Sequence, residues 1–247
     1  MVLLHGLFGS NDNLGGLARA LAETHTVHAL DLRNHGRSPH AETMHLPTLA
    51  ADVRETMAAH HLDAAAFLGH SLGGKVAMEL ALTEPERVDR LVVIDMAPIA
   101  YGRGHDTKLE AMRGLDLTAL ASRRDADAAL ASGVPSSAIR QFLLKNLVRG
   151  EDGFTWRIPL DTISEQYAHF AAAPSVGVYE GPTLFLRGAG SSYLTDDTVP
   201  TIRERFPQAR IETIEDAGHW VHIEAPNASA KVIVTFLDRS RTTDEHG

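Results

Sequence analysis

The stretch Phe67-Leu68-Gly69-His70-Ser71-Leu72-Gly73-Gly74 decides the fold. It places a serine between two glycines at the spacing G-x-S-x-G, which is typical of a nucleophile held on a sharp strand-to-helix turn. A strained turn at Ser71 brings the residues two before and two after it close together, and only small residues fit there. The turn would present the Ser71 hydroxyl at the positive N-terminal end of the following helix.

The flanking residues support this strand–turn–helix arrangement. Ala64–Leu68 is an apolar run of the length of a short buried strand. Val76 and Leu80 then recur at helical spacing, and Pro85 ends the helical pattern. The alternative is a glycine-rich turn with an incidental serine, and the ordered context on both sides argues against it.

Further short apolar runs alternate with helical patterns along the chain. This alternation predicts a mostly parallel sheet with helices on both faces. Besides the strand before Ser71, the expected strands are Val2–Leu4, Thr26–Leu30, Leu91–Ile94, Thr183–Leu186 and a more polar edge strand around Ile211 and Ile214.

One long segment breaks this alternation. Apolar residues at helical spacing predict helices there, the strongest of them from Ile139 to Leu147 and capped near its start by a serine. Ligands of open α/β sheets bind at the carboxyl ends of the strands. We therefore expect residues 100–179 to form a helical lid over that edge, and residues 1–99 and 180–247 to form the core.

Composition narrows the possible classes of protein. A chain of 247 residues with 44% hydrophobic content can bury a large core, and its net charge of −9 argues against a nucleic-acid surface. The absence of cysteine excludes disulfides and thiol catalysis, and fits a reducing compartment. No apolar run is long enough to span a bilayer, and the N-terminus lacks signal-peptide features. We expect a cytoplasmic monomer or homodimer without nucleic-acid or membrane partners.

A serine nucleophile needs a base, and His219 has the expected position among the 14 histidines. It follows the strand around Ile211 and precedes the final helix, which opens at Pro226. The base lies there when a triad runs serine, acid, histidine along the chain. We expect kcat/KM to fall as the pH drops through the pKa of His219, near 6.5 if unperturbed. His222 is interpreted as a packing or capping residue.

The acid of the triad is less directly indicated. In many proteins of this arrangement it follows the strand before the last one, but Ser191 occupies that position here. Asp95 closes the apolar strand Leu91–Ile94, and a buried carboxylate there needs a partner. We expect Asp95 to orient His219. Asp196 or Asp197 is the alternative acid, and capping of the next loop is the alternative role for Asp95.

The remaining catalytic parts are backbone groups. His5-Gly6-Leu7-Phe8-Gly9 follows the first strand, and the second donor of an oxyanion hole comes from that place. We expect the N–H groups of Leu7 and Leu72 to form the oxyanion hole, with Phe8 as an alternative to Leu7.

No metal-binding spacing and no complete dinucleotide-binding loop is present in the sequence, so we expect no metal and no cofactor.

Six motifs along the chain resemble those of a known family. They are His5–Ser10, Asp31–Gly36, Gly69–Lys75, Asp95–Pro98, Ile139–Lys145 and Ala217–His222, and they resemble the YbfF-type esterases. The resemblance implies an α/β-hydrolase fold with a helical lid inserted after the strand that ends at Asp95. It also implies hydrolysis of acyl thioesters and short-chain esters, with the acid at the Asp95 position.

One departure from that family concerns the start of the chain. Family members usually carry a segment before the first strand that supplies an outer hairpin, whereas this chain starts almost inside the strand. Either an N-terminal piece is absent here, or the sheet is shortened and leaves Thr26–Leu30 as an exposed edge.

We therefore expect a serine carboxylesterase or thioesterase that cleaves a small acyl ester or thioester through an acyl-enzyme. Phe8, Phe142 and Trp156 are expected to bind short- to medium-chain substrates, although the lid aromatics could instead form only the small core of the lid.

Two other functions remain open. Carbon–carbon bond hydrolysis or a lyase step could use the same triad, with Arg140, Lys145 or Arg157 in the lid binding a charged substrate. A ligand-binding module on the same fold is the other alternative, and an intact serine–histidine–aspartate set argues against it.

Overall fold

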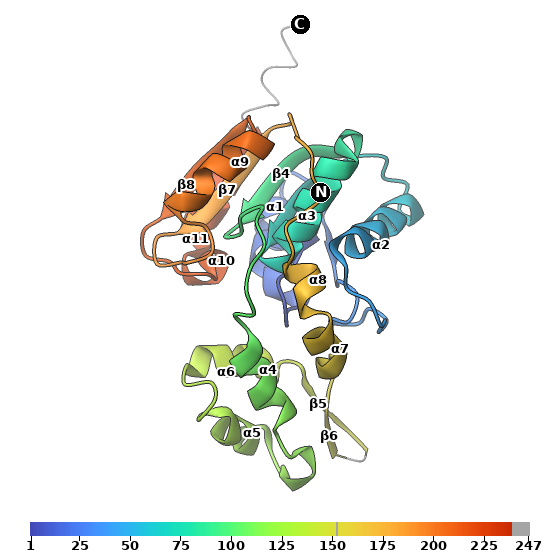
Figure 1. Cartoon of the computed structure of the whole chain (residues 1–247), viewed down its shortest axis with the longest axis vertical. Helices are drawn as coiled ribbons and strands as arrows, with labels where there is room; N and C mark the ends of the chain where they lie inside the picture. The colour runs from blue at the N-terminus through green and yellow to red at the C-terminus, as the bar shows by residue number, and fades with distance from the viewer. Residues whose placement is uncertain (152, 239–247) are drawn as a thin grey trace, which may run out of the picture.

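The computed structural model describes residues 1–151 and 153–238. Six parallel strands form one sheet in the order β2-β1-β3-β4-β7-β8 (Figure 1). All the strands expected from the sequence are present, with β2 and the more polar β8 at the two edges. Their bounds are Val2–Leu4 (β1), His28–Leu30 (β2), Ala65–His70 (β3), Val88–Ile94 (β4), Thr183–Gly188 (β7) and Ala209–Ile214 (β8).

Both faces of the sheet are covered by helices, because consecutive strand residues point to opposite sides and both sides are apolar. Leu3 and Leu68 belong to one buried cluster, and their neighbours Val2 and Phe67 belong to the other. The first cluster contains residues of α1 (Gly15–Leu21) and α11 (Pro226–Asp238), and the second those of α2 (Leu46–Ala59), α3 (Leu72–Thr83) and α9 (Val199–Arg205). The expected layered architecture is confirmed.

Residues 100–179, which we call the lid segment, are inserted between β4 and β7. Figure 1 shows its helices α4 to α6 set apart from the sheet layers. The elements are α4 (Asp106–Arg113), α5 (Arg123–Leu130), α6 (Ser137–Leu144), α7 (Leu160–Glu165), α8 (Tyr167–Ala171) and an antiparallel hairpin of β5 (Leu147–Gly150) and β6 (Gly153–Trp156). Ser136 caps α6 by accepting the N–H of Ile139, as the sequence indicates. The hairpin was not expected, because strands of four residues are too short to show a periodicity.

A buried lysine joins both ends of the lid segment to the core. Lys75 lies on α3 and is 2% exposed. Its ammonium donates to the carbonyls of Ile99, at 2.8 Å, and Ala171, at 2.7 Å, and also to that of Ala172. Burial lowers the pKa of Lys75 to about 7. Because α3 begins directly after Ser71, the helix that follows this serine also binds the two connections of the lid segment.

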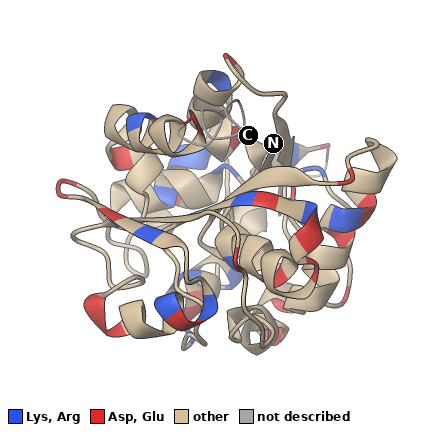
Figure 2. Ribbon diagram, turned by 90° about the horizontal axis from the view of Figure 1, so that it is seen from above, with Lys and Arg blue, Asp and Glu red and all other residues tan. Residues whose placement is uncertain are grey.

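Acidic and basic residues are interspersed over the elements of the molecule (Figure 2). None of the helices in the described part of the chain combines the length and the apolar character that crossing a bilayer requires.

Candidate active site

Ser71 lies on a strained turn between β3 and α3. Its backbone has φ 53° and ψ −116°, outside the regions that non-glycine residues normally occupy. A Cβ atom on Gly69 would lie 2.2 Å from the carbonyl oxygen of Gly73, and one on Gly73 would lie 2.2 Å from that of Leu4. Both glycines are therefore required for the close approach of the backbone, which is the steric reason for the G-x-S-x-G spacing.

Three side chains from separate segments form a hydrogen-bonded chain at this turn. His219 Nε2 lies 3.1 Å from Ser71 Oγ, and His219 Nδ1 lies 2.7 Å from Asp95 Oδ2. Asp95 follows β4 and is fully buried, and His219 lies between β8 and α10 (Val221–Glu224). If Nδ1 donates to Asp95, Nε2 is free to accept the hydroxyl proton of Ser71. The structure thus brings together the three residues selected from the sequence.

Ser191, which occupies the position where the acid was first expected, forms a hydrogen bond to Asp95. Its hydroxyl donates to Asp95 Oδ2, and the N–H of Gly188 donates to Oδ1 at 3.4 Å. Burial raises the pKa of the Asp95 carboxyl well above its usual range, while these two hydrogen bonds oppose the shift. The sequence reasoning treated Ser191 only as an absent acid. The alternative acids Asp196 and Asp197 are both exposed, and Asp196 pairs with Arg187 at 2.7 Å.

The surroundings of His219 keep its imidazole neutral. Burial lowers the pKa of His219 to about 4, below the value near 6.5 of an unperturbed histidine. The ring of Tyr193 stacks on that of His219, with 4.0 Å between centroids and 22° between planes. His70 Nε2 donates to the carbonyl oxygen of His219 at 3.0 Å and so holds the loop between β8 and α10 that carries His219. A neutral imidazole is the form that can act as a base.

Two buried histidines hold the loop after β1. The N–H of Phe8 donates to His35 Nε2 at 3.2 Å, and the N–H of Leu32 donates to His5 Nε2 at 3.1 Å. Burial lowers the pKa of His35 to about 3, so its ring remains a neutral acceptor. Since the N–H of Phe8 already has a partner, Leu7 is the better candidate for an oxyanion donor. Leu72 lies in the first turn of α3, where N–H groups have no partner within the helix.

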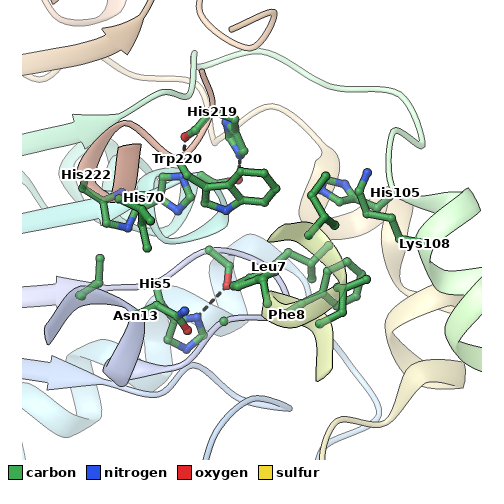
Figure 3. Close-up of a pocket in the computed structure, with 18 of the residues that line it drawn as sticks. His5, Leu7, Phe8, Asn13, His70, His105, Lys108, His219, Trp220 and His222 are labelled. Carbon is green, nitrogen blue, oxygen red and sulfur yellow. Dashed lines mark hydrogen bonds between the residues drawn. The ribbon is translucent and has the colours of Figure 1, made fainter. Parts of the chain in front are cut away.

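A cavity of about 220 Å³ borders Ser71 and His219. Figure 3 shows His5, Asn13, His70 and His222 on one side of it and His105 and Lys108 on the other. The lid segment contributes α4 and α6 to the wall. The apolar and aromatic lining residues are Leu7, Phe8, Leu14, Ile139, Phe142, Leu143, Tyr193, Trp220 and Ile223.

Of the aromatic residues expected at the substrate, Phe8 and Phe142 line this cavity and Trp156 does not. The indole N–H of Trp156 donates to the carbonyl of Met112 at 3.1 Å, and the side chain borders a separate surface hollow beside Arg113. The expectation for Trp156 is therefore wrong in its placement. Its position depends on the direction of the β5–β6 hairpin, which the sequence pattern does not reveal.

The lid cations named from the sequence also lie outside the cavity. Arg140 pairs with Asp127 at 2.9 Å, and Lys145 and Arg157 are exposed. The basic residue that does line the cavity is Lys108, which the sequence reasoning missed. Within residues 1–151 and 153–238, no group of three or more histidine, aspartate or glutamate side chains is placed to hold a metal ion.

Comparison with known proteins agrees with this geometry. The family model described as the alpha/beta hydrolase fold matches residues 1–226. The chain belongs to the α/β-hydrolase fold family.

Relatives narrow the type of α/β hydrolase. The chain is 39% identical to "Esterase YbfF" of Escherichia coli (strain K12), over 96% of this chain and 92% of that protein. It is 38% identical to "sn-1-specific diacylglycerol lipase ABHD11" of Mus musculus, over 96% and 80%. A solved "Marine microorganism esterase" superposes with a TM-score of 0.92 at 34% identity, over 95% of this chain and 94% of that one. This α/β hydrolase is an enzyme of the esterase and lipase type, and the resemblance to YbfF-type esterases is confirmed.

Proposed function

We propose that this α/β hydrolase is a serine esterase that cleaves acyl esters or thioesters through an acyl-enzyme on Ser71. The observation that carries the proposal is the continuous hydrogen-bonded chain from Ser71 through His219 to Asp95. Ser71 borders a cavity lined by apolar and aromatic side chains together with a few polar ones, which is typical of a small-molecule binding site.

The mechanism follows from the position of each group. His219 takes the proton of the Ser71 hydroxyl as that oxygen attacks the acyl carbonyl, and then gives the proton to the leaving group. Asp95 holds the imidazole in orientation and stabilises its charged form. The N–H groups of Leu7 and Leu72 bind the oxyanion. Water activated by His219 then attacks the acyl-enzyme and releases the acid.

The lining of the cavity supports a short- to medium-chain substrate. Phe8 and Phe142 provide aromatic surface, and each methylene that a substrate buries there contributes about 0.8 kcal/mol. Peptide substrates are disfavoured, because their amides would lose water without gaining enough polar partners. Whether the scissile bond is an oxygen ester or a thioester depends on the leaving group, and the same triad serves both.

We further propose a cytoplasmic location.

The proposal is tested with p-nitrophenyl esters and acyl-CoA thioesters of graded chain length. We expect hydrolysis by the wild type, and a loss of several orders of magnitude in kcat for Ser71→Ala with an unchanged melting temperature. Ser132→Ala, at an exposed position of the lid segment, is the matched control and should retain activity. Near-normal turnover in Ser71→Ala, or no hydrolysis of any ester by the wild type, would overturn the proposal.

A further inference from the structure

The cavity beside Ser71 contains one charged side chain that has no role in the triad. Lys108 lies on α4 of the lid segment, and Figure 3 shows it beside His105 on the lid side of the cavity. It is the only lysine or arginine among the described residues that line this space. It is also partly buried, and this burial lowers the pKa of its ammonium.

Within residues 1–151 and 153–238, no acidic side chain pairs with this ammonium. Among the described residues, Lys108 has neither an ion pair nor a hydrogen bond from its side chain, and the lining of the cavity contains no carboxylate. The neighbouring acid Asp106 pairs with Arg103 at 2.7 Å. Glu224 accepts the N–H groups of Gly218 and Trp220. A partly desolvated ammonium without a partner costs free energy. A ligand that pairs an anionic group with it therefore gains binding free energy.

The other titratable groups of the cavity cannot take this role. Burial lowers the pKa values of His70 and His105 to about 3, and also lowers those of His5 and His222, so these rings are neutral near pH 7. His105 is additionally engaged, since its Nδ1 lies 2.7 Å from the hydroxyl of Tyr167. Burial is the main cause of the lowered pKa of His219; the charge of Glu224 opposes this shift and the positive charge of Lys108 adds to it.

We infer that Lys108 binds a carboxylate of the substrate, and that the preferred substrates are esters or thioesters bearing one carboxylate close to the scissile carbonyl. This inference rests on the proposed esterase function and specifies its substrate class. A single ammonium matches a single negative charge, whereas a phosphate or diphosphate would call for several cations or a cluster of N–H groups. The carboxylate can belong to the acyl part, as in a half-ester of a dicarboxylic acid, or to the leaving group.

Matched esters separate these two sources. On the leaving-group side, 4-carboxyphenyl butyrate is compared with 4-carbamoylphenyl butyrate. On the acyl side, the monophenyl ester of adipic acid is compared with the phenyl ester of adipamic acid. Each carboxylate is thus matched by a primary amide of similar size and no charge. The measured quantity is the ratio of kcat/KM for the carboxylate ester to that for its amide.

We expect this ratio to be about tenfold or more in at least one series, the change expected for one charge-assisted hydrogen bond. Lys108→Met should bring the ratio close to one, Lys108→Arg should retain a preference for the carboxylate, and Lys108→Glu should invert it. Lys145→Met removes an exposed lysine of the same segment and should leave the ratio unchanged. A ratio near one in the wild type, or one that persists in Lys108→Met, would overturn the inference.

A binding measurement keeps this test independent of turnover. In Ser71→Ala, calorimetry compares adipamic acid with adipamide as probes, with and without Lys108→Met. Tighter binding of the carboxylate that disappears in Lys108→Met supports the anion site even if no ester is hydrolysed, in which case the esterase function alone fails. The same comparison with 4-hydroxybenzoate and 4-hydroxybenzamide covers the leaving-group side. Equal binding within both pairs of probes, or a preference that survives Lys108→Met, contradicts the site.

Discussion

At the scale of single residues, the environment decides the chemistry of each side chain. We propose Asp95 as the acid because it meets His219, and because a hydrogen bond from Ser191 stabilises the carboxylate against the effect of its burial. Asp196 has the same carboxylate but lies on the surface beside Arg187. The two aspartates therefore make a matched pair for mutation.

Asp95→Asn should lower kcat on the order of 10⁴, because an amide in place of the carboxylate favours the wrong tautomer of His219 and cannot stabilise its charged form. Asp196→Asn should cost little, since it removes an exposed ion pair. Steady-state kinetics on one ester, with melting temperatures for both variants, check this prediction. A large loss in Asp196→Asn together with near-normal activity in Asp95→Asn would refute the assignment.

The pH dependence tests the environment of His219. Burial lowers its pKa to about 4, and only the neutral imidazole accepts the Ser71 proton. Burial also raises the pKa of Asp95, so the acid limb of kcat/KM belongs to the hydrogen-bonded pair of His219 and Asp95. We therefore expect its midpoint to lie below pH 6.5. The measurement is kcat/KM between pH 3.5 and 8, restricted to values at which the protein stays folded. A half-maximal value at pH 6.5 or above would show that the imidazole is not desolvated as the structure indicates.

Lys108 provides a second observation on the same curve. Its positive charge disfavours the imidazolium, so Lys108→Met should raise the pKa of His219 and move the acid limb to higher pH. Lys145→Met serves as the control, because that exposed side chain does not line the cavity. An acid limb that stays in place in Lys108→Met would mean that the lysine lies too far from the imidazole to act on it.

At the scale of secondary-structure elements, the lid segment divides its aromatic residues between two tasks. Phe142 on α6 faces the cavity and packs against Trp220, with 5.7 Å between ring centroids. Trp156 on β6 is bonded to Met112 and contributes to the structure of the lid segment itself. The alternative that the lid aromatics form only a small core thus applies to Trp156 and not to Phe142.

Phe142→Ala should weaken the dependence of kcat/KM on substrate chain length, because a methylene that loses its apolar neighbour contributes less than the usual 0.8 kcal/mol or so. Trp156→Ala should lower the melting temperature and leave the chain-length dependence as in the wild type. A series of p-nitrophenyl esters measured with both variants distinguishes the two roles. The assignment of Phe142 to the substrate cavity and of Trp156 to the lid structure fails if the chain-length preference changes in Trp156→Ala alone.

At the scale of the whole molecule, the core was predictable and the lid segment was only partly so. Parallel strands buried on both faces appear in the sequence as short apolar runs. The glycines around Ser71 are required because a Cβ atom at either position would overlap a neighbouring backbone carbonyl. In the lid segment, by contrast, periodicity shows which face of a helix is apolar but not what that face contacts. Lys108 was missed for this reason, since it lies next to the apolar position Leu109 but faces the cavity.

The most direct test of the catalytic centre is the site of labelling by a fluorophosphonate probe, which reacts with activated serine hydroxyls. Peptide mass spectrometry of the labelled wild type should find the adduct on Ser71 alone among the serines, and labelling should be strongly slowed in His219→Ala, which lacks the base. An adduct on another serine, or labelling of Ser71 that is equally fast without His219, would contradict the triad.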